Sequence, residues 1–418
     1  MKKPKTILYT TTTAIAALAF FSEQLGHLRR EGWDVHFITP AEPSDQVKRA
    51  IQASGATHHT LNFAREISPR HDLRSLLEMI RIVWKVRPDV INFSTPKAGL
   101  LGGIASALLG TPLRVYFIHG LRSETAATGK LALLRPVLLQ MERLTCWCAH
   151  EVLCVSPSNR DEAVKLGMVP DQKIRVLGAG SPAGIPFERY QHPNPQAVAA
   201  ARQELNLPEG TPVVGFVARM APQKGIEELL LAWPLVHQRV PNAKFLLVGT
   251  PDPANPLSEK AQQAFETAPN LIQVRFEADM SRLYPLMTVH TLPSRHEGLG
   301  MVVLEAAANG VPSVITDASG VRDAGVPGVT CLQVPSGDVE ALADALVQLL
   351  TDQPLRDKLG QQAQAWVKQH FAQERLWALW DEFYAQAWEK QRRRARADLR
   401  PWAVGAAILA LALTRRRR

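Results

Sequence analysis

Short runs of β-branched and other apolar residues alternate along most of the chain with longer stretches whose apolar positions recur at helical spacing. Runs of this length, bounded by turn residues, are typical of buried strands, and the stretches between them are typical of amphipathic helices. The predicted strands are 6–10, 34–39, 90–93, 113–118, 151–155 and 173–177, then 213–217, 244–248, 272–276, 289–292 and 313–316. This alternation predicts an α/β fold with parallel sheets covered by helices on both faces.

The chain of 418 residues is too long for one ordinary core, and a Gly- and Pro-rich stretch at 178–186 interrupts the alternation. We therefore expect one domain over 1–180 and a second over 181–370. A Trp-rich helix is expected from about 371 to 396, with residues 371–390 docked across the domains and a separate tail over 391–418. The glycines of 174–184 resemble a dinucleotide-binding fingerprint, but the prolines that follow oppose the helix which that motif opens.

The first 21 residues permit two interpretations. Lysines precede an apolar stretch, as in a secretory signal. The alternative, which we favour, is a strand at 6–10, a helix at about 14–31 and a strand at 34–39.

Net charge is +9, but the tail 391–418 holds nine arginines against one acid, so the rest of the chain is close to neutral. No nucleic-acid-binding face is indicated. The four cysteines lack zinc-site spacing and are interpreted as buried thiols in a reducing compartment.

Two segments suggest contact with an anionic membrane surface. Residues 402–413 form an apolar run between arginines; as a helix it would cover about 18 Å, too little for the ~30 Å hydrocarbon layer. An interfacial anchor and a disordered translated remnant both fit this run. Residues 131–144 show an amphipathic pattern with basic residues; ordinary core packing is the interpretation that we favour, and membrane contact is the alternative.

The sequence PSRHEGLGMVVLE at 293–305 carries the first candidate chemistry. Glu297 ends a strand, Gly298 and Gly300 permit a tight turn, and a helix from about Met301 offers free backbone N–H groups to an anion. Glu305 lies about two turns further on. Two carboxylates flanking an anion site fit a nucleotide sugar, whose diphosphate lies between two groups rich in hydroxyls.

The sequence GFVARMAPQKG at 215–225 predicts a strand, a loop and the start of a helix. Arg219 is suited to binding a phosphate with two hydrogen bonds, and Lys224 to acting on it as a point charge. Two solvated surface cations are the alternative interpretation.

Together these segments resemble the retaining glycosyltransferase family 4, whose GT-B fold has two Rossmann-like, doubly wound parallel-sheet domains facing a central cleft. The resemblance covers about residues 5–385. The strings REISP at 65–69, STPKAGLLG at 94–102, HGLR at 119–122 and CVSPS at 154–158 resemble the subgroup that builds capsule, O-antigen and undecaprenyl-diphosphate-linked glycans.

The resemblance implies a role for each matching residue. Glu297 would lie against the donor sugar, Arg219 and Lys224 would bind the diphosphate, and His119 would reach the reacting centre. Glu305 would bind the ribose. Donor-binding residues would be Gly298, Leu299, Gly300, Met301 and Glu305; acceptor-binding residues would be Arg65 and Lys97. Alternatives without a role in catalysis or binding are a polar residue at a strand end for His119, and surface or interdomain charges for Arg65 and Lys97.

The implied activity is retaining transfer of a hexose or N-acetylhexosamine from a UDP-sugar to an undecaprenyl-diphosphate-linked saccharide. No Asp-x-Asp occurs in the sequence, which agrees with metal-independent transfer, and no cofactor is expected besides the UDP-sugar substrate. The resemblance places such an enzyme in the cytoplasm, peripherally on the inner face of a bacterial plasma membrane. Alternatives are a catalytically inactive assembly subunit and a sugar-nucleotide epimerase.

Overall fold

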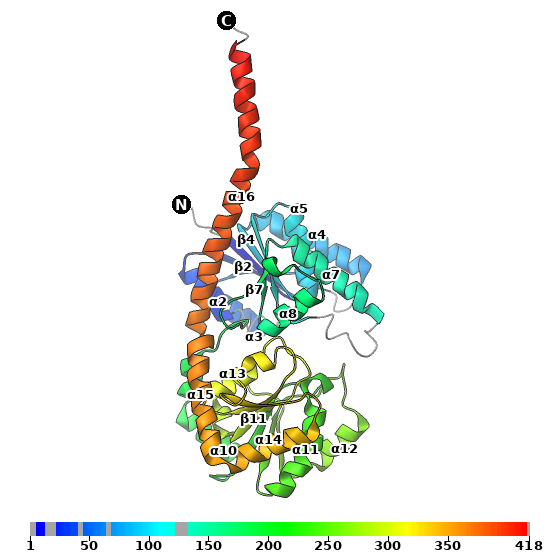
Figure 1. Cartoon of the computed structure of the whole chain (residues 1–418), viewed down its shortest axis with the longest axis vertical. Helices are drawn as coiled ribbons and strands as arrows, with labels where there is room; N and C mark the ends of the chain where they lie inside the picture. The colour runs from blue at the N-terminus through cyan, green and yellow to red at the C-terminus, as the bar shows by residue number, and fades with distance from the viewer. Residues whose placement is uncertain (1–5, 13–21, 41–44, 64–67, 122–132, 416–418) are drawn as a thin grey trace.

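The computed structural model describes residues 6–12, 22–40, 45–63, 68–121 and 133–415, with side chains as far as Ala395. Over this part of the chain it forms two parallel sheets, each covered by helices on both faces (Figure 1). The strand orders are β3-β2-β1-β4-β5-β6-β7 and β10-β9-β8-β11-β12-β13. The predicted α/β class with two Rossmann-like domains is confirmed.

The elements have the following bounds. The first sheet contains β1 (Thr6–Thr10), β2 (Asp34–Thr39), β3 (Thr57–Thr60), β4 (Val90–Ser94), β5 (Leu113–Ile118), β6 (Glu151–Cys154) and β7 (Ile174–Val176). The second contains β8 (Val213–Val217), β9 (Lys244–Val248), β10 (Leu271–Val274), β11 (Val289–Leu292), β12 (Ser313–Thr316) and β13 (Cys331–Val334). Helices around the first sheet are α2 (Ser22–Arg30), α3 (Asp45–Ala53), α4 (Pro69–Val86), α5 (Pro96–Leu108), α7 (Arg135–Cys148) and α8 (Pro157–Lys165). The remaining helices are α9 (Phe187–Gln191), α10 (Pro195–Glu204), α11 (Ile226–Arg239), α12 (Glu259–Thr267), α13 (Met301–Ala308), α14 (Val339–Thr351), α15 (Gln353–Phe371) and α16 (Gln373–Arg415).

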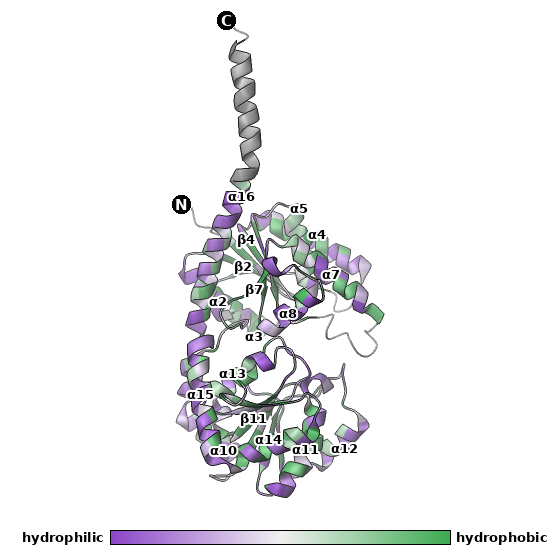
Figure 2. Cartoon of the chain, in the orientation of Figure 1, coloured by the Kyte–Doolittle hydropathy of each residue, from purple (hydrophilic) through white to green (hydrophobic). Residues whose placement is uncertain are grey.

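Alternate residues of each strand enter different cores, because successive side chains of a strand point to opposite faces. In β1, Ile7 and Tyr9 join the apolar cluster that contains residues of α2 and α16. Leu8 joins the cluster under α4, α5 and α7 on the other face. Figure 2 shows the apolar strands inside and the polar sides of the helices outside. Both faces of the sheet are therefore buried, as a parallel sheet requires.

The two strands missing from the sequence prediction, β3 and β13, lie at the edges of their sheets. The first, with sequence THHT, has no buried residue. The second has only four residues, with Cys331 and Val334 buried. An edge strand is covered on fewer sides than a central one, so neither segment needs the continuous apolar run on which the prediction depended.

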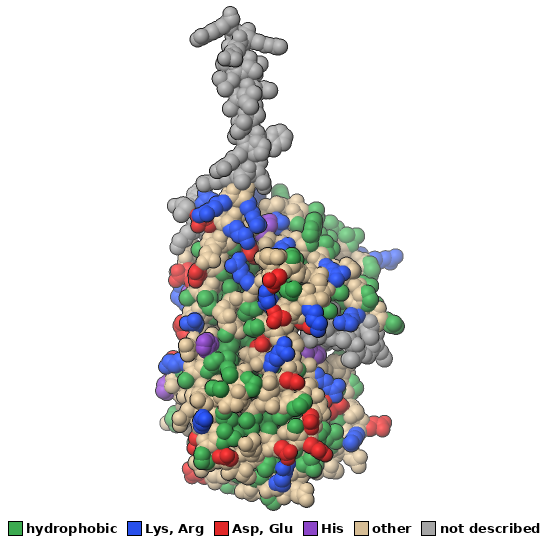
Figure 3. Space-filling view, viewed as in Figure 1, with side chains coloured by type: hydrophobic (Ala, Val, Ile, Leu, Met, Phe, Trp, Pro, Cys, Tyr) green, Lys and Arg blue, Asp and Glu red, His purple; other side chains and the backbone are tan. Residues whose placement is uncertain are grey.

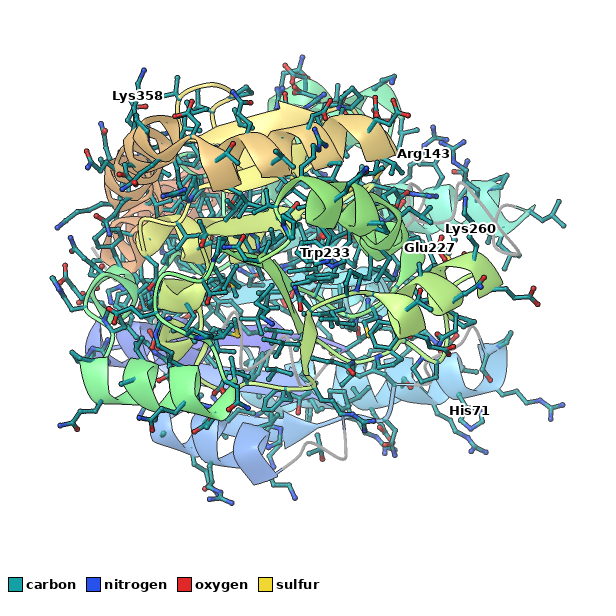
Figure 4. The ribbon with its side chains drawn as sticks, turned by 90° about the horizontal axis from the view of Figure 1, so that it is seen from below. His71, Arg143, Glu227, Trp233, Lys260 and Lys358 are labelled. Carbon is teal, nitrogen blue, oxygen red and sulfur yellow. The ribbon has the colours of Figure 1, made fainter. Side chains whose placement is uncertain are left out.

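The second domain is organised around α11, whose Trp233 is fully buried. The indole N–H of Trp233 donates to the carbonyl of Pro269 at 2.7 Å. Figure 4 shows Trp233 in the interior, whereas Glu227 and Lys260 lie toward the periphery. A large aromatic side chain with its one polar group satisfied gives this half of the molecule its own core.

The glycines of the 174–184 segment serve close packing between chain segments. Gly180 and Gly184 have φ of 106° and 75°. A Cβ on Gly180 would meet the carbonyl of Val155 at 2.2 Å, and one on Gly184 would meet the Cα of Gln373 at 2.7 Å. The segment leads into the five-residue helix α9, so the glycine pattern lacks the long helix of a dinucleotide site.

The single helix predicted from about 371 to 396 is interrupted at its start. Helix α15 ends at Phe371 and α16 begins at Gln373, with Ala372 between them in an extended conformation. Ala372 forms a parallel bridge with Ile185, whose N–H donates to the carbonyl of Phe371 at 2.7 Å. The chain thus leaves the second domain beside the segment by which it entered.

Helix α16 packs on the first domain through a buried polar cluster. The hydroxyls of Tyr384 and Tyr9 lie 2.7 Å apart, and the side-chain amide of Asn92 donates to Tyr384 at 2.8 Å. Trp380, 1% exposed, packs edge-on against Phe117 at a centroid distance of 5.1 Å. The last helix is therefore part of the core of the first domain.

Three further observations concern expectations from the sequence. All four cysteines are buried and free, and burial raises the pKa of the Cys154 thiol to about 12. Across the described side chains, no helix is both long enough and apolar enough to cross a bilayer. The predicted helix at 14–31 is seen as α2, with residues 13–21 outside the described part.

Trp380→Ala should lower the free energy of unfolding by about 3–5 kcal/mol, because it leaves a large cavity between α16 and β5. The matched control is Trp84→Ala, whose side chain is 62% exposed and whose loss should change stability by less than about 0.5 kcal/mol. Denaturant unfolding of both variants measures the difference; equal stabilities would show that α16 is not part of the core.

Candidate active site

A cavity of about 280 Å³ lies between the two domains. It is lined by Thr95, Pro96, Tyr116, His119, Gly120, Leu121, Arg219, Gln223, Lys224, His296, Glu297 and Gly298. The structure thus brings together His119, Arg219, Lys224, Glu297 and Gly298 from among the predicted site residues.

The sheet topology explains why these residues meet. Strands β8 and β11 are neighbours at the point where the strand order reverses. Arg219 follows the carboxyl end of β8, Glu297 follows that of β11, and His119 follows β5 in the first sheet. Loops after the carboxyl ends of parallel strands form a crevice at such a reversal, where ligands of open α/β sheets bind.

Lys224 and Glu297 form an ion pair in the crevice. The ammonium Nζ lies 2.6 Å from Oε1 of Glu297, which also accepts a hydrogen bond from Ser294 Oγ at 2.8 Å. Gly225, with φ of 70°, lets the two loops approach, since a Cβ there would lie 1.9 Å from the carbonyl of Pro293. The lysine and the glutamate are therefore held at fixed positions by two loops that support each other.

A second set of contacts, made by Arg295, joins the loop after β11 to the loop after β8 and to α11. The backbone N–H of Arg295 donates to the carbonyl of Gln223 at 3.0 Å. Its guanidinium donates to the buried carboxylate of Glu228 on α11 through Nε at 3.0 Å and Nη2 at 2.6 Å. A double contact of this kind fixes orientation as well as charge.

Arg219 pairs with Asp252, whose side chain is buried although that of Arg219 is 59% exposed. Burial opposes ionisation of Asp252, but hydrogen bonds from Asn255 and the N–H of Ala254, together with the guanidinium, hold the pKa of its carboxyl below the ordinary value. The guanidinium of Arg219 thus has a fixed counter-charge in Asp252, while most of the arginine side chain stays exposed.

The two domains touch through backbone at Gly298. A Cβ on this residue would lie 2.0 Å from the carbonyl oxygen of His119, so a larger residue would force the domains apart. Asn159 on α8, fully buried, donates its side-chain amide to the carbonyls of Glu297 and Gly298, both at 2.8 Å. The first domain therefore holds the loop of the second by its main chain.

Ser158, next to Asn159, extends this contact. Its N–H donates to Asp323 Oδ2 at 2.9 Å, and its hydroxyl accepts from the N–H of Gly320 at 2.6 Å. Sequence reasoning did not single out Asn159 or Asp323. The two residues are more than 160 positions apart in the sequence, and only the folded chain brings them together.

His119 is neutral near pH 7, because burial lowers the pKa of its imidazole to about 4. Its ring packs against Phe117 at a centroid distance of 4.5 Å. A neutral imidazole in a crevice can donate or accept one hydrogen bond without adding charge.

The remaining predicted donor-site residues surround the start of α13. Gly300 caps this helix and Met301 is its first residue, with its sulfur 3.5 Å from the hydroxyl of Ser181 in the segment joining the domains. Leu299 is buried in the core. The amino-terminal end of α13 thus follows directly after the Glu297–Gly298 loop, with the N–H groups of Met301 and Val303 donating to the carbonyls of Leu299 and Gly300 at 2.7 and 2.9 Å.

Glu305 lies outside the residues that line the cavity. Tyr284 Oη donates to its Oε2 at 2.7 Å. Burial raises the pKa of the Glu305 carboxyl to about 7, with the Tyr284 hydrogen bond acting in the opposite direction. This group therefore changes charge close to neutral pH, whereas an exposed glutamate does not.

Of the two predicted acceptor residues, the structure describes only Lys97. Lys97, in the first turn of α5, forms an ion pair with Asp72 of α4 at 2.8 Å. It adjoins Thr95 and Pro96 of the cavity lining. Arg65 lies outside the described residues. Among the side chains described, no group of three or more His, Cys, Asp or Glu is placed to hold a metal ion.

Two family models match the chain. Residues 198–366 match the model described as glycosyl transferases group 1, and residues 19–180 match the glycosyl transferase 4-like domain. Together they cover most of both domains.

Relatives match over most of their length. The chain is 31% identical to the capsular polysaccharide biosynthesis glycosyltransferase CapM of Staphylococcus aureus, over 92% of this chain and 97% of that protein. It is 24% identical to the UDP-Gal:alpha-D-GlcNAc-diphosphoundecaprenol alpha-1,3-galactosyltransferase of Escherichia coli, over 78% and 83%. The crystal structure of Anabaena HepE with UDP and glucose superposes with a TM-score of 0.76 at 19% identity, over 91% and 100%.

Asn159→Asp should open the crevice, because it places a carboxylate against the carbonyls of Glu297 and Gly298. Loss of these bonds should lower stability by about 1–3 kcal/mol, and the radius of gyration should increase. Thermal unfolding and small-angle X-ray scattering measure the two effects, with the exposed Asn62→Asp as control. If both variants matched the unmodified protein, Asn159 would not hold the domains together.

Glu305→Gln should remove a pH dependence of stability. The folded protein binds the Glu305 proton more tightly than the unfolded chain, whose carboxyl has the ordinary pKa of 4.5. This contribution is therefore complete below about pH 4.5 and is lost as the pH rises through about 7. The difference in melting temperature between the unmodified protein and Glu305→Gln should shift across this window; a constant difference would contradict the raised pKa.

Proposed function

The chain belongs to the family 4 glycosyltransferases of the GT-B fold, and we propose that it transfers a hexose or N-acetylhexosamine from a UDP-sugar to an undecaprenyl-diphosphate-linked saccharide, with retention of configuration. The names of the relatives support a place in capsule or undecaprenyl-linked glycan synthesis. The donor and the stereochemistry are part of the proposal.

The observation that carries the proposal is the convergence of Arg219, Lys224, Glu297 and His119 on one crevice between the domains. Arg219 follows the carboxyl end of β8, Lys224 pairs with Glu297 in the loop after β11, and this loop leads into α13, whose amino-terminal end carries partial positive charge. A diphosphate bound there would have two fixed cations and a helix terminus around it. This arrangement supports binding of a nucleoside diphosphate sugar.

In the proposed step, the acceptor hydroxyl attacks the anomeric carbon from the side of the departing UDP. The bond from this carbon to the phosphate oxygen breaks as the bond to the acceptor oxygen forms. The hydroxyl proton passes to the leaving phosphate, so no separate base is required. Arg219 and Lys224 stabilise the charge that develops on the diphosphate, the electrostatic role that a metal ion plays elsewhere.

Glu297 and His119 lie on opposite sides of the crevice, one from each domain. Glu297 is proposed to accept hydrogen bonds from donor-sugar hydroxyls while it keeps Lys224 in position. The neutral His119 is proposed to contact the sugar or the acceptor hydroxyl near the reacting carbon. Because each residue comes from a different domain, both contacts need the crevice closed.

Glu305 is proposed to bind the ribose of the donor. Its carboxyl accepts a hydrogen bond from Tyr284, and Glu305 is not among the residues that line the cavity. Acceptor binding is assigned to Lys97 and Arg65, and the lipid diphosphate of such an acceptor supports basic partners. We further propose a cytoplasmic location, at the inner face of the membrane, where nucleotide sugars and lipid-linked acceptors meet.

Glu297→Ala should reduce sugar transfer by about 100-fold or more, because the donor sugar loses its carboxylate contact. UDP binding should be unchanged or stronger, because Lys224 loses its carboxylate partner and is free to bind the diphosphate. A donor panel with a short-chain polyprenyl-diphosphate saccharide measures transfer, and calorimetry measures UDP binding. The exposed Glu340→Ala on α14 is the matched control. Undiminished transfer by Glu297→Ala would overturn the site assignment.

The same assay separates the finer parts of the proposal. Turnover that persists in excess EDTA supports metal-independent transfer, whereas its loss contradicts it. UDP binding without turnover across the donor panel would favour an inactive assembly subunit. Conversion of the donor in the absence of acceptor would indicate an epimerase.

A further inference from the structure

Large apolar side chains are exposed mainly on one face of the first domain. Of fourteen such residues among those described, ten belong to α4, α7 or the adjoining ends of these helices and α5. The remaining four are scattered over the second domain. The ten are Leu73, Leu77, Trp84, Leu108, Leu109, Leu133, Leu134, Val137, Leu144 and Trp147, and we name this surface the α4–α7 face. A concentrated apolar surface marks an interaction site, whereas scattered residues do not.

On α4 the exposed apolar positions recur at helical spacing. Leu73, Leu77 and Trp84 are 58%, 53% and 62% exposed, while the buried side of the helix carries Ser75, Met79 and Val83. The helix is therefore apolar on two sides. One side packs on the sheet, and the other has no counterpart within the described part of the molecule.

Basic residues are interleaved with the apolar ones on α4. Those exposed on or just after the helix are Arg70, Arg74, Arg81, Lys85 and Arg87. Glu78 is the exposed acid on the helix, since Asp72 is half-buried against Lys97. The outer side of α4 is thus strongly positive as well as apolar.

Helix α7 has a second stripe of the same kind. Val137, Leu144 and Trp147 are 52%, 42% and 75% exposed, and Leu133 just before the helix is 91% exposed. The acid of this helix, Glu142, is buried. Arg143 donates to the carbonyls of Leu166 and Gly167, which keeps its charge beside the stripe.

Helix α5 packs on both α4 and α7, and the three helices lie on the same side of the first domain (Figure 1). Its exposed large apolar residues are Leu108 at its carboxyl end and Leu109 just after it, and its contacts with both α4 and α7 place the two stripes on one side of the sheet. Figure 3 shows hydrophobic side chains with Lys and Arg among them along the edge that these helices form. Between 133 and 144 the apolar side chains are exposed or half-buried, and the buried residues of α7 are Glu142, Thr145, Cys146 and Cys148, so ordinary core packing describes only the last turn of this helix.

The basic part of α16 adjoins the same end of the domain. Lys390 pairs with Glu151 at the start of β6 at 2.6 Å, and Arg394 is close enough to His150 to contribute to its lowered pKa, after burial and the nearer cations Arg114 and Lys173. His150 lies two residues after the end of α7, and thus near Trp147. The sequence of α16 then continues into the apolar and Arg-rich segment 396–415.

We propose that the α4–α7 face is a docking surface for an anionic lipid bilayer. Exposed Trp and Leu side chains beside Arg and Lys are the combination that enters the headgroup region, because the rings are amphipathic and the cations attract acidic lipids. The face bears on the proposed function, because it would place the crevice beside a lipid-linked acceptor.

A second copy of this chain is the competing occupant, and the charges oppose it. Face-to-face pairing would bring the arginines of one α4 toward those of the other, with Glu78 as the exposed acid of each helix to offset them. Like charges in close contact disfavour such a pair, whereas a bilayer containing phosphatidylglycerol supplies the missing negative charge.

Co-sedimentation of the full chain with vesicles of equimolar phosphatidylcholine and phosphatidylglycerol tests the proposal. Two double variants are compared, Trp84→Ser with Trp147→Ser, and Arg74→Glu with Arg81→Glu. Each should weaken vesicle binding by about tenfold or more. All variants keep residues 391–418, so a difference reports the face and not the tail.

Matched controls come from the second domain. Phe276→Ser replaces an aromatic residue that is 74% exposed, and Lys358→Glu reverses an exposed charge on α15, which points to the outside in Figure 4. Neither should change vesicle binding. Binding of the unmodified chain should fall in high salt and on pure phosphatidylcholine vesicles.

Unchanged binding of both double variants would overturn the proposal, as would a dimer in sedimentation equilibrium that both variants dissociate. Transfer to a water-soluble acceptor is measured in parallel and should be unaffected by all four changes. Loss of vesicle binding with full transfer supports the α4–α7 face. Absence of transfer in the unmodified chain would instead refute the proposed function without bearing on the face.

Discussion

The crevice depends on one close contact between backbones. Gly298 lies against the carbonyl of His119 with no room for a side chain, and Asn159 fixes the same loop through two main-chain carbonyls. Since main-chain atoms have a constant position relative to their own sheet, this contact transmits the placement of one domain to the other. Together with the bonds from Ser158 to Asp323 and from Gly320 to Ser158, it sets His119 relative to the charged residues across the crevice.

The charged groups of the crevice are neutralised in pairs within the second domain. Lys224 is held by Glu297, and Arg219 by the buried Asp252. Each pair joins loops that are distant in sequence, so the charges also stabilise the shape of the site. The result is a preorganised surface in which cations need not be gathered when a ligand binds, which reduces the reorganisation that binding requires.

The central strands, and the motif residues that the structure brings to the crevice, could be found in the sequence because their signals are local. Apolar runs such as 213–217 and the glycines of 298–300 need no knowledge of neighbours. The edge strands β3 and β13 escaped because they lack an apolar run, and the break at Ala372 escaped because Ile185, far earlier in the chain, determines it. Asn159 escaped for the same reason, as its partners exist only after the two domains have met. The placement of Glu305 beside Tyr284 likewise requires two elements that are separate along the chain.

The chain crosses between the domains at two places that run side by side. Ile185 donates to the carbonyl of Phe371 and accepts from the N–H of Gln373 at 3.0 Å, so the outgoing and returning segments form a short two-stranded hinge. A lone tether allows one body to swivel about it in any direction. Two segments that are hydrogen-bonded to each other resist twisting, so we expect the two domains to move relative to each other by hinge bending about one axis.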